Sequence, residues 1–281
     1  MIIIRFAEIG LKGKNRAFFE KALIQNIKAC LDKHKIEYKN IERPMGRILI
    51  STDDSCACLQ RVFGIASFSD AVNAGFNMES VKKEALKFAK DLNPRKSFRI
   101  TCQRLDKRFP LTSQQFDIEL GAFVQEKTKA KVKMKGFDLN IRAEIINNFV
   151  YLFTEKTQGQ GGLPIGVEGN VLVLLDDEKS LLAGLLMMKR GCRIIPVALK
   201  QIDISLLEKY AFGQKISLKI IKGISEIDGL AKEYKTKALV VSDLLDTMKE
   251  YPVETKIFRP LIAYEPKEIE EELNGFRQRV C

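Results

Sequence analysis

Two clusters of lysine and arginine in the middle of the chain have a spacing suited to phosphate groups. The segment 95–110 holds six basic residues against one acidic residue, with Phe98 and Phe109 between them. From Lys127 to Lys135 a lysine occurs at every second position, and an extended backbone would place these ammonium groups on one face. Lysine supplies charge but little base-specific contact, so we expect shape-based binding to an RNA backbone. The alternative is a solvated strand edge that lysines protect from aggregation.

The excess of positive charge lies entirely in the first part of the chain, although the net charge is +11 overall. Basic and acidic residues number 12 and 7 over 1–65, 17 and 11 over 66–165, and 18 and 18 over 166–281. This asymmetry indicates a polyanion-binding front half and a neutral back half, unless the surface is merely lysine-rich in the manner of thermophilic proteins. The residues that we expect to contact RNA phosphates are Lys12, Lys14, Arg16, Arg95, Lys96, Arg99, Arg104, Lys107, Arg108, Lys131, Lys133 and Lys135.

The cysteines and the single histidine disfavour a metal site. The six cysteines form no CxxC pair, and His34 is the only histidine, so we expect no bound metal. Cys56 and Cys58 are interpreted as small residues near a strand-to-helix junction. His34 lies in a lysine-rich helix end, where we expect a solvated residue of the last turn rather than a catalytic base.

Composition and length indicate an ordinary globular protein of 281 residues, 46% hydrophobic and 30% charged. Disordered, collagen-like and coiled-coil classes are excluded, and the length predicts two or three domains. No apolar run reaches the roughly 18 to 20 residues of a membrane helix, and the first residues do not resemble a signal peptide. We therefore expect a soluble, cytoplasmic protein with no membrane partner.

The first 165 residues alternate short strands with amphipathic helices, which predicts α+β structure. Asn147 and Asn148 have the character of a tight hairpin turn between two strands. A helix that starts between residues 54 and 58 is expected to end at Phe63-Gly64. The other expected strands are 1–7, 39–43, 46–51, 97–103, 140–146 and 149–155, and the other expected helices are 15–33, 78–92 and 112–127.

A different pattern follows the segment Gly159–Pro164, which we interpret as a linker. Continuous apolar strands alternate with helices there, and this alternation is typical of a parallel sheet in a three-layer α/β domain. The expected strands are 171–175, 193–199, 217–222, 238–242 and 257–260, and the expected helices are 179–190 and 227–234.

Several segments, in order, resemble the tRNA 4-thiouridine synthetase (ThiI-like) family. They are EIGLKGKNRAFFEKAL (8–23), RVFGIASFS (61–69), FRITCQRLDKRFPLTSQQFDIELGAFV (98–124), GQGGLPIGVEGNVLVLL (159–175), MMKRGCRIIPVA (187–198) and FRPLIAYEPKEIEEEL (258–273). The resemblance covers nearly all of the chain. It implies α+β ferredoxin-like (1–58) and THUMP RNA-binding (59–165) domains, followed by a Rossmann-like, PP-loop-type α/β domain (166–281).

The same resemblance implies ATP and magnesium as cofactors, but the nucleotide loop departs from the family pattern. The family has SGGxDS after the first strand of this domain, where small glycines let backbone N–H groups surround phosphates. The aligned residues here are Leu175, Asp176, Asp177, Glu178, Lys179 and Ser180. Only the final serine is retained, and acids stand where both glycines should be. Negative charge opposes a polyphosphate, so we expect a degenerate loop without ATP.

Two further departures agree with that expectation. The family motif TGExLGQ corresponds to 241–246, where its glycines are missing. The family's catalytic cysteine has only Cys281 as a weak counterpart, at the end of a domain of 116 residues that is short for the family.

These observations favour a tRNA-binding, ThiI-like protein related to 4-thiouridine formation and thiamine biosynthesis, without ATP-pyrophosphatase activity of its own. The resemblance implies tRNA as a partner, together with a sulfur-donating or modifying enzyme and a homodimeric state. One alternative is an active ATP-dependent tRNA sulfurtransferase with an altered pocket. The other is a protein-interaction module that does not bind RNA.

Overall fold

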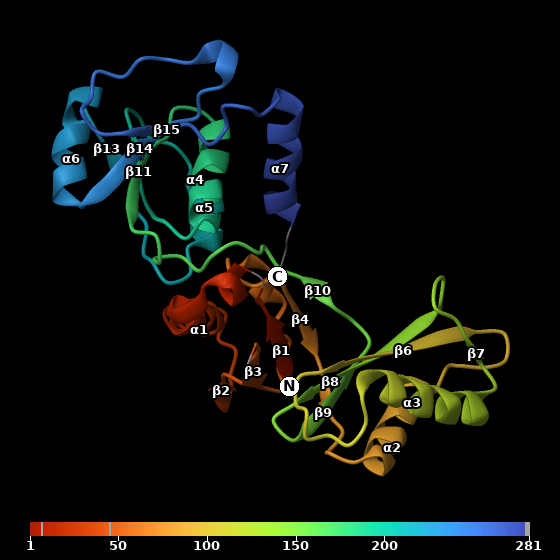
Figure 1. Ribbon diagram of the computed structural model, residues 1–281. Helices are drawn as coiled ribbons and strands as arrows, with labels where there is room; N and C mark the ends of the chain where they lie inside the picture. The colour runs from red at the N-terminus through yellow and green to blue at the C-terminus, as the bar shows by residue number, and fades with distance from the viewer. Residues whose placement is uncertain (7, 45, 279–281) are drawn as a thin grey trace. The chain divides into compact units, whose positions relative to one another are not determined.

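The structure is a computed structural model that describes residues 1–6, 8–44 and 46–278 (Figure 1). By its internal contacts the chain divides into two compact units that alternate along the sequence. Unit 1 consists of Met1–Ile4, Tyr38–Asp53 and Phe68–Thr157, and unit 2 of Arg5–Glu37, Asp54–Ser67 and the chain from Gln158 onward.

The first sheet has the strand order β10-β4-β1-β3-β2. β1 and β3 are antiparallel, with Ile2 opposite Ile50, and their side chains are almost fully buried. The strands expected near both positions are confirmed. The strand bounds are Ile2–Arg5 (β1), Asn40–Glu42 (β2), Ile48–Ser51 (β3), Ser67–Asp70 (β4) and Thr157–Gln158 (β10).

The first long helix, α1, runs over Arg16–Lys33 as expected. Asn15 precedes it, but its side chain makes no capping hydrogen bond, because 3₁₀ turns at Glu8–Leu11 and Gly13–Asn15 lead directly into the helix. The prediction of a helix that ends at Phe63-Gly64 is wrong, because the chain forms only a 3₁₀ turn there, Ala57–Arg61. Its residues are mostly buried, and an apolar run this short cannot be told from a helix by pattern alone.

A second sheet, of order β5-β9-β8-β6-β7, carries two helices on one face. Helices α2 (Met78–Phe88) and α3 (Ser113–Thr128) lie side by side on it (Figure 1) and share an apolar core with its strands. A capping box of Thr112 and Gln115 starts α3. The strand bounds are Val72–Asn73 (β5), Ser97–Arg104 (β6), Lys131–Val132 (β7), Leu139–Ile146 (β8) and Phe149–Phe153 (β9).

The predicted hairpin between β8 and β9 is confirmed. Asn147 and Asn148 have φ values of 46° and 63°, the left-handed conformation that a type I′ turn requires at both positions. Asparagine accepts this conformation more readily than most residues. The turn therefore sets the β8–β9 register, in which Ile146 lies opposite Phe149.

The C-terminal domain is a parallel sheet between two helical layers, as the sequence predicts. The strand order is β13-β12-β11-β14-β15, and every pairing is parallel. Helices α4 and α7 lie on one side of this sheet and α6 on the other (Figure 1), with α5 in the α4 core. The bounds are Asn170–Leu174 (β11), Arg193–Ala198 (β12), Lys219–Ile220 (β13), Thr236–Val240 (β14), Ile257–Phe258 (β15), Lys179–Lys189 (α4), Ser205–Tyr210 (α5), Ile227–Glu233 (α6) and Pro266–Gln278 (α7).

The segment Gly159–Pro164 is not a free linker, which corrects the interpretation from sequence. The Gly161 backbone exchanges hydrogen bonds with Gly64 and Ile65, and Leu163 N–H donates to the Lys189 carbonyl at 2.9 Å. A Cβ placed on Gly162 would lie 2.2 Å from that same carbonyl oxygen. The glycines permit close backbone packing here rather than flexibility.

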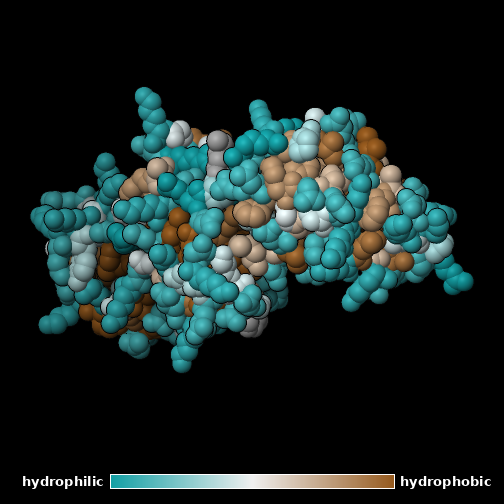
Figure 2. Space-filling model, turned by 90° about the horizontal axis from the view of Figure 1, so that it is seen from below, coloured by the Kyte–Doolittle hydropathy of each residue, from teal (hydrophilic) through white to brown (hydrophobic). Residues whose placement is uncertain are grey.

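No helix among the described residues is long and apolar enough to cross a membrane. Hydrophilic side chains make up most of the face shown in Figure 2, with smaller patches of hydrophobic side chains between them.

Candidate functional sites

Six of the expected phosphate-binding residues gather where β6 begins, and we call them the basic edge: Arg95, Lys96, Arg99, Lys131, Lys133 and Lys135. Parallel pairing of β7 with β6 brings the two clusters together, with Ser97 opposite Lys131. Lys131 N–H donates to the Lys96 carbonyl at 3.0 Å, and Arg99 Nη1 donates to the Met134 carbonyl at 3.1 Å. Segments more than 30 residues apart thus form one basic surface.

The lysine run is only partly extended, which modifies the expectation from sequence. β7 covers two residues, Lys131 and Val132, and Lys133 N–H still bonds the Phe98 carbonyl at 2.9 Å before the chain turns. β7 is the last strand of its sheet, so its lysines occupy an edge. Val132 and Met134, which alternate with these lysines, are 46% and 66% exposed. The basic edge therefore offers apolar contacts beside its charges.

Arg104, Lys107 and Arg108, which we call the arginine loop, lie at the opposite end of β6 from the basic edge. The strand has eight residues, so about 23 Å separates its ends. Arg108 binds the Asp106 carboxylate through Nε and Nη2 at 2.9 and 2.7 Å, and Arg104 donates to the carbonyls of Asp106 and Lys107. The Arg108 hydrogen bonds hold the pKa of Asp106 well below its usual range. Two guanidinium groups are thus engaged in ordering their own loop.

The remaining expected RNA contacts, Lys12, Lys14 and Arg16, belong to unit 2. Arg16 Nε lies 2.6 Å from the Glu20 carboxylate, and Lys12 Nζ lies 4.0 Å from Glu168 and 4.7 Å from the Phe19 ring centre. Lys14 is exposed. Two of the three cations already have acidic neighbours.

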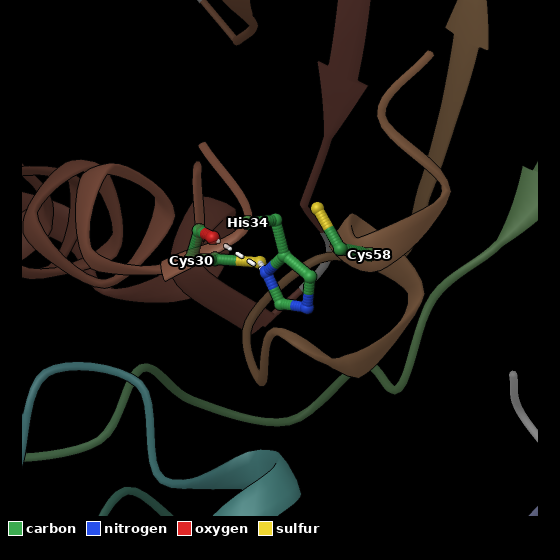
Figure 3. Close-up of side chains that lie close together, drawn as sticks. All are labelled: Cys30, His34 and Cys58. Atoms are coloured by element: carbon green, nitrogen blue, oxygen red, sulfur yellow. Dashed lines mark hydrogen bonds between the residues drawn. The ribbon is translucent and has the colours of Figure 1, made fainter. Parts of the chain in front are cut away.

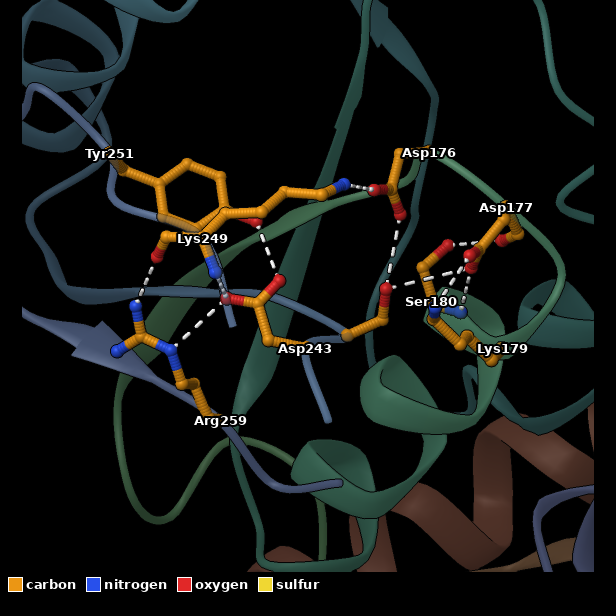
Figure 4. A network of polar contacts seen from close by, with 9 residues as sticks. Asp176, Asp177, Lys179, Ser180, Asp243, Lys249, Tyr251 and Arg259 are labelled. Atoms are coloured by element: carbon orange, nitrogen blue, oxygen red, sulfur yellow. Dashed lines mark hydrogen bonds and ion pairs between the residues drawn. The ribbon is translucent and has the colours of Figure 1, made fainter. Parts of the chain in front are cut away.

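The second candidate site is the carboxyl end of the parallel sheet. In the sheet, β11 lies between β12 and β14. The chain continues from β11 to β12 and β13 on one side and then crosses to β14 and β15 on the other, so the strand order reverses beside β11. Ligands of open α/β sheets bind in the crevice at such a point. The loops that meet there are 175–178 after β11 and 241–243 after β14, and both contain residues that the sequence analysis assigned to the nucleotide site (Figure 4).

The start of α4, where a phosphate would bind, is occupied by a carboxylate of the chain. Asp177 Oδ1 accepts a hydrogen bond from the Ser180 backbone N–H at 3.1 Å, and the Ser180 hydroxyl donates to the Asp177 carbonyl. Lys179 Nζ lies 3.1 Å from Asp177 Oδ2, and Arg277 pairs with Glu178. A carboxylate that accepts from an N–H group in the first turn of a helix, as Asp177 does, stabilises the helix start.

Asp243, only 3% exposed, is the centre of a second set of contacts in the same crevice. Its carboxylate accepts hydrogen bonds from Tyr251 Oη at 2.9 Å, Arg259 Nε at 3.1 Å and the Lys249 backbone N–H at 3.2 Å (Figure 4). Burial, followed by the bond to Asp243, raises the pKa of Tyr251 above its usual range, so the phenol stays protonated. Sequence reasoning missed Lys249, Tyr251 and Arg259. Lys249 and Tyr251 lie in a loop that carries no motif, and Arg259 directly follows β15, a strand end that the sequence analysis did not consider as part of the site.

Asp176 completes the network from the other loop. Its carboxylate accepts from Ser242 Oγ at 3.1 Å and lies 3.4 Å from Lys249 Nζ (Figure 4). The crevice therefore pairs its acids with its own cations and hydroxyls. Cys281, the weak candidate for catalysis, lies outside the described residues.

One group of side chains in unit 2 was not foreseen from the sequence. Cys30, His34 and Cys58 have their ligand atoms within 4.8 Å of one another. The expectation that His34 is a solvated residue is wrong, because it is partly buried and both ring nitrogens have partners. A hydrogen bond with Cys30 and the charge of Arg61 lower the pKa of Cys58 despite its burial. The spacing of Cys30 and His34, four residues apart on a helix, was the available signal.

Comparisons with known proteins agree with this architecture. The family model for the ThiI ferredoxin-like domain matches residues 1–69, and the THUMP domain model matches residues 76–155. A probable tRNA sulfurtransferase of Thermococcus kodakarensis is 30% identical over 96% of this chain and 85% of its own length. One of Natranaerobius thermophilus is 36% identical, but the match covers 80% of this chain and 56% of that protein. The chain thus spans little more than half of that relative.

Two solved structures share the fold. The crystal structure of PH1313 from Pyrococcus horikoshii has a TM-score of 0.88 and 31% identity, covering 98% of this chain and 99% of that one. A 4-thiouridine synthetase in complex with RNA and ATP has a TM-score of 0.78 at 23% identity, and the match covers 98% of this chain and 84% of that one. At that identity the second likeness concerns the fold alone.

Proposed function

The chain belongs to the ThiI family, with its ferredoxin-like, THUMP and C-terminal α/β domains, and from this premise we propose that it binds tRNA for thio-modification without using ATP itself. The relatives named above are probable tRNA sulfurtransferases. The proposal has two parts, a tRNA surface on the THUMP domain and a C-terminal domain that does not take a nucleotide.

The observation that carries the first part is the basic edge. Arg95, Lys96, Lys131, Lys133 and Lys135 are exposed, and backbone hydrogen bonds between β6 and β7 fix the segments that bear them. Charges held on a rigid strand edge contact phosphates with little loss of backbone freedom. The arginine loop and the cations near Glu20 and Glu168 are less available, because acids or carbonyls already engage them.

The occupied crevice supports the second part. A nucleotide bound in the family's manner would need the backbone N–H groups at the start of α4, and Asp177 already uses that of Ser180. Asp176 and Asp243 would add negative charge beside a polyphosphate.

The first part is tested by measuring tRNA affinity of the full chain at several salt concentrations. With six or more phosphates bound, affinity falls on the order of a thousandfold between 50 and 200 mM salt. Replacing Lys131, Lys133 and Lys135 by Gln should weaken binding and reduce the salt slope by about 0.9 for each phosphate that the variant no longer neutralises.

The matched control replaces three exposed lysines of the C-terminal domain, Lys200, Lys215 and Lys222, by Gln. It removes the same charge and should leave affinity within about twofold. Equally weakened binding in the two triple variants, or a flat salt response of the unaltered protein, would contradict the assignment of RNA binding to the basic edge.

The second part is tested by calorimetry with ATP and magnesium. We expect no binding with a dissociation constant below about 100 μM, which corresponds to roughly −5.5 kcal/mol. Replacing Asp176 and Asp177 by Gly should not create turnover, because the glycines of the 241–246 motif are also missing. Tight ATP binding together with pyrophosphate release would instead identify an active sulfurtransferase with an altered pocket.

A further inference from the structure

Two thiols and the only imidazole of the chain converge in unit 2, at the C-terminal end of α1 (Figure 3). Cys30 lies in α1, and His34 follows one turn later as the C-cap of that helix. Cys58 comes from the 3₁₀ turn Ala57–Arg61. The three ligand atoms lie within 4.8 Å of one another, with Cys30 Sγ 4.0 Å from His34 Nδ1. We propose that Cys30, His34 and Cys58 bind a zinc ion.

The ligand types favour zinc over harder cations. Thiolate and imidazole are the ligands that Zn²⁺ uses in proteins, whereas Mg²⁺ and Ca²⁺ require oxygen ligands. At Zn–S and Zn–N distances of about 2.3 and 2.0 Å, tetrahedral ligand atoms lie roughly 3.5 to 3.8 Å apart. The observed separations, at most 4.8 Å, need to shrink by at most about 1.3 Å, which side-chain rotation can supply.

The three side chains of this cluster leave one position of a tetrahedral ion open. Cys30 is 0% and Cys58 is 2% exposed, and His34 is partly exposed. A metal ion can therefore enter from the histidine side, and a water molecule can fill the fourth position there. Each thiol that binds as thiolate gives its proton to the solvent, so zinc binding should release protons.

Arg61 engages the imidazole of the cluster. Its Nη2 lies 2.8 Å from His34 Nε2, and because arginine can only donate, Nε2 accepts and Nδ1 carries the proton. Nδ1 then donates to the Cys30 carbonyl at 2.7 Å. Zinc on Nε2 would replace Arg61 directly, and zinc on Nδ1 would leave a proton on Nε2. Either way the Arg61 hydrogen bond must break, so Arg61 should weaken zinc binding.

The test uses the full chain, stripped of metal with a chelator under reducing conditions and then titrated with Co²⁺ as a spectroscopic substitute for Zn²⁺. We expect one equivalent to give thiolate-to-cobalt charge-transfer absorption and the ligand-field bands of a tetrahedral ion, both removed by added Zn²⁺. Cys58→Ser and His34→Gln should each lower the affinity at least about tenfold, the lower end of the effect typical of residues that support a metal site. Arg61→Gln should raise it.

Cys192→Ser is the matched control, because it removes a buried cysteine of the α4 core that is not part of the cluster. It should leave the cobalt spectrum unchanged. Absence of charge-transfer absorption in the unaltered protein would overturn the proposal, and this arm does not depend on any variant folding. Mass spectrometry of the non-denatured protein under reducing conditions gives a second check. A mass lower by two hydrogens, with Cys30 found linked to Cys58, would show a disulfide and would also overturn the proposal.

Discussion

Asp177 and Ser180 are joined by a hydrogen bond that closes the N-terminus of α4: Asp177 Oδ1 accepts from the Ser180 backbone N–H at 3.1 Å. A carboxylate in this position satisfies an N–H group that the helix itself cannot. It also adds a favourable interaction with the helix dipole. Asp177 thus has a structural role in this chain.

Asp177→Ala should destabilise the protein by about 0.5 to 2 kcal/mol, because the helix then has no side-chain cap at this position. Asp177→Asn keeps an acceptor oxygen at the same place and should cost less. Chemical denaturation measures both. If the two variants are equally unstable, the hydrogen bond is not the source of the effect.

Arg108→Ala should change tRNA affinity less than twofold, because the guanidinium is bound to Asp106 in its own loop. Lys133→Ala in the basic edge should weaken binding and lower the salt slope by about 1. Arg108→Ala should instead lower the thermal midpoint, since Asp106 would have no charged partner in the loop. If Arg108→Ala weakens tRNA binding more than Lys133→Ala does, the assignment of RNA binding to the basic edge rather than to the arginine loop is wrong.

Asp117 should make stability depend on pH. Burial away from water raises its pKa to about 6, although its Oδ1 accepts a hydrogen bond from Cys102 N–H at 2.8 Å. The folded state therefore holds this proton more tightly than the unfolded state, whose carboxyl has a pKa near 3.9. The contribution of Asp117 to stability is largest below about pH 4 and disappears as pH rises through 6.

Thermal midpoints of the unaltered protein and Asp117→Asn between pH 4 and 7 check this sign. Asn stays neutral, so the difference between the two proteins should move in favour of Asn as pH rises. A difference that is constant across the range would show that Asp117 titrates alike in both states.

Glu144→Gln should be strongly destabilising, by about 3 to 5 kcal/mol, because it leaves the Arg47 guanidinium buried without its counter-charge. Arg47 Nε lies 2.6 Å from Glu144 Oε2, and both side chains are at most 10% exposed. The double variant Arg47→Met with Glu144→Leu should cost less than either single change. Lys87→Ala, which breaks an exposed pair with Glu84, serves as the control and should cost less than about 1 kcal/mol.

Periodicity and turn chemistry predicted most of the fold. The parallel C-terminal sheet follows from apolar strands between helices, and the β8–β9 hairpin follows from Asn147 and Asn148. The sequence predicts a helix where the structure has the 3₁₀ turn Ala57–Arg61, because a short buried segment carries no periodic signal. The glycines at 159–162 predict a linker but are packed in the structure, since the need for close backbone approach depends on residues far along the chain.

Site residues were predictable only where they are close in sequence. Residues 95–108 form one basic run along the chain, yet β6 places its two ends about 23 Å apart. Pairing of β7 with β6 then brings Lys131 next to Lys96, whose carbonyl accepts the Lys131 N–H, and no local pattern indicates this. The same reason applies to Cys58, which meets Cys30 and His34 only through the tertiary fold.

The alternation of the two compact units along the chain has a consequence for synthesis on the ribosome. Unit 1 begins with Met1 but is not complete until Thr157 has been made, and by then two segments of unit 2, Arg5–Glu37 and Asp54–Ser67, have already emerged. We expect these two segments to complete their packing only after the chain beyond Gln158 has been made. Nascent chains stopped shortly after Thr157 should therefore expose apolar residues of α1, such as Leu23 and Ile27, to chaperones.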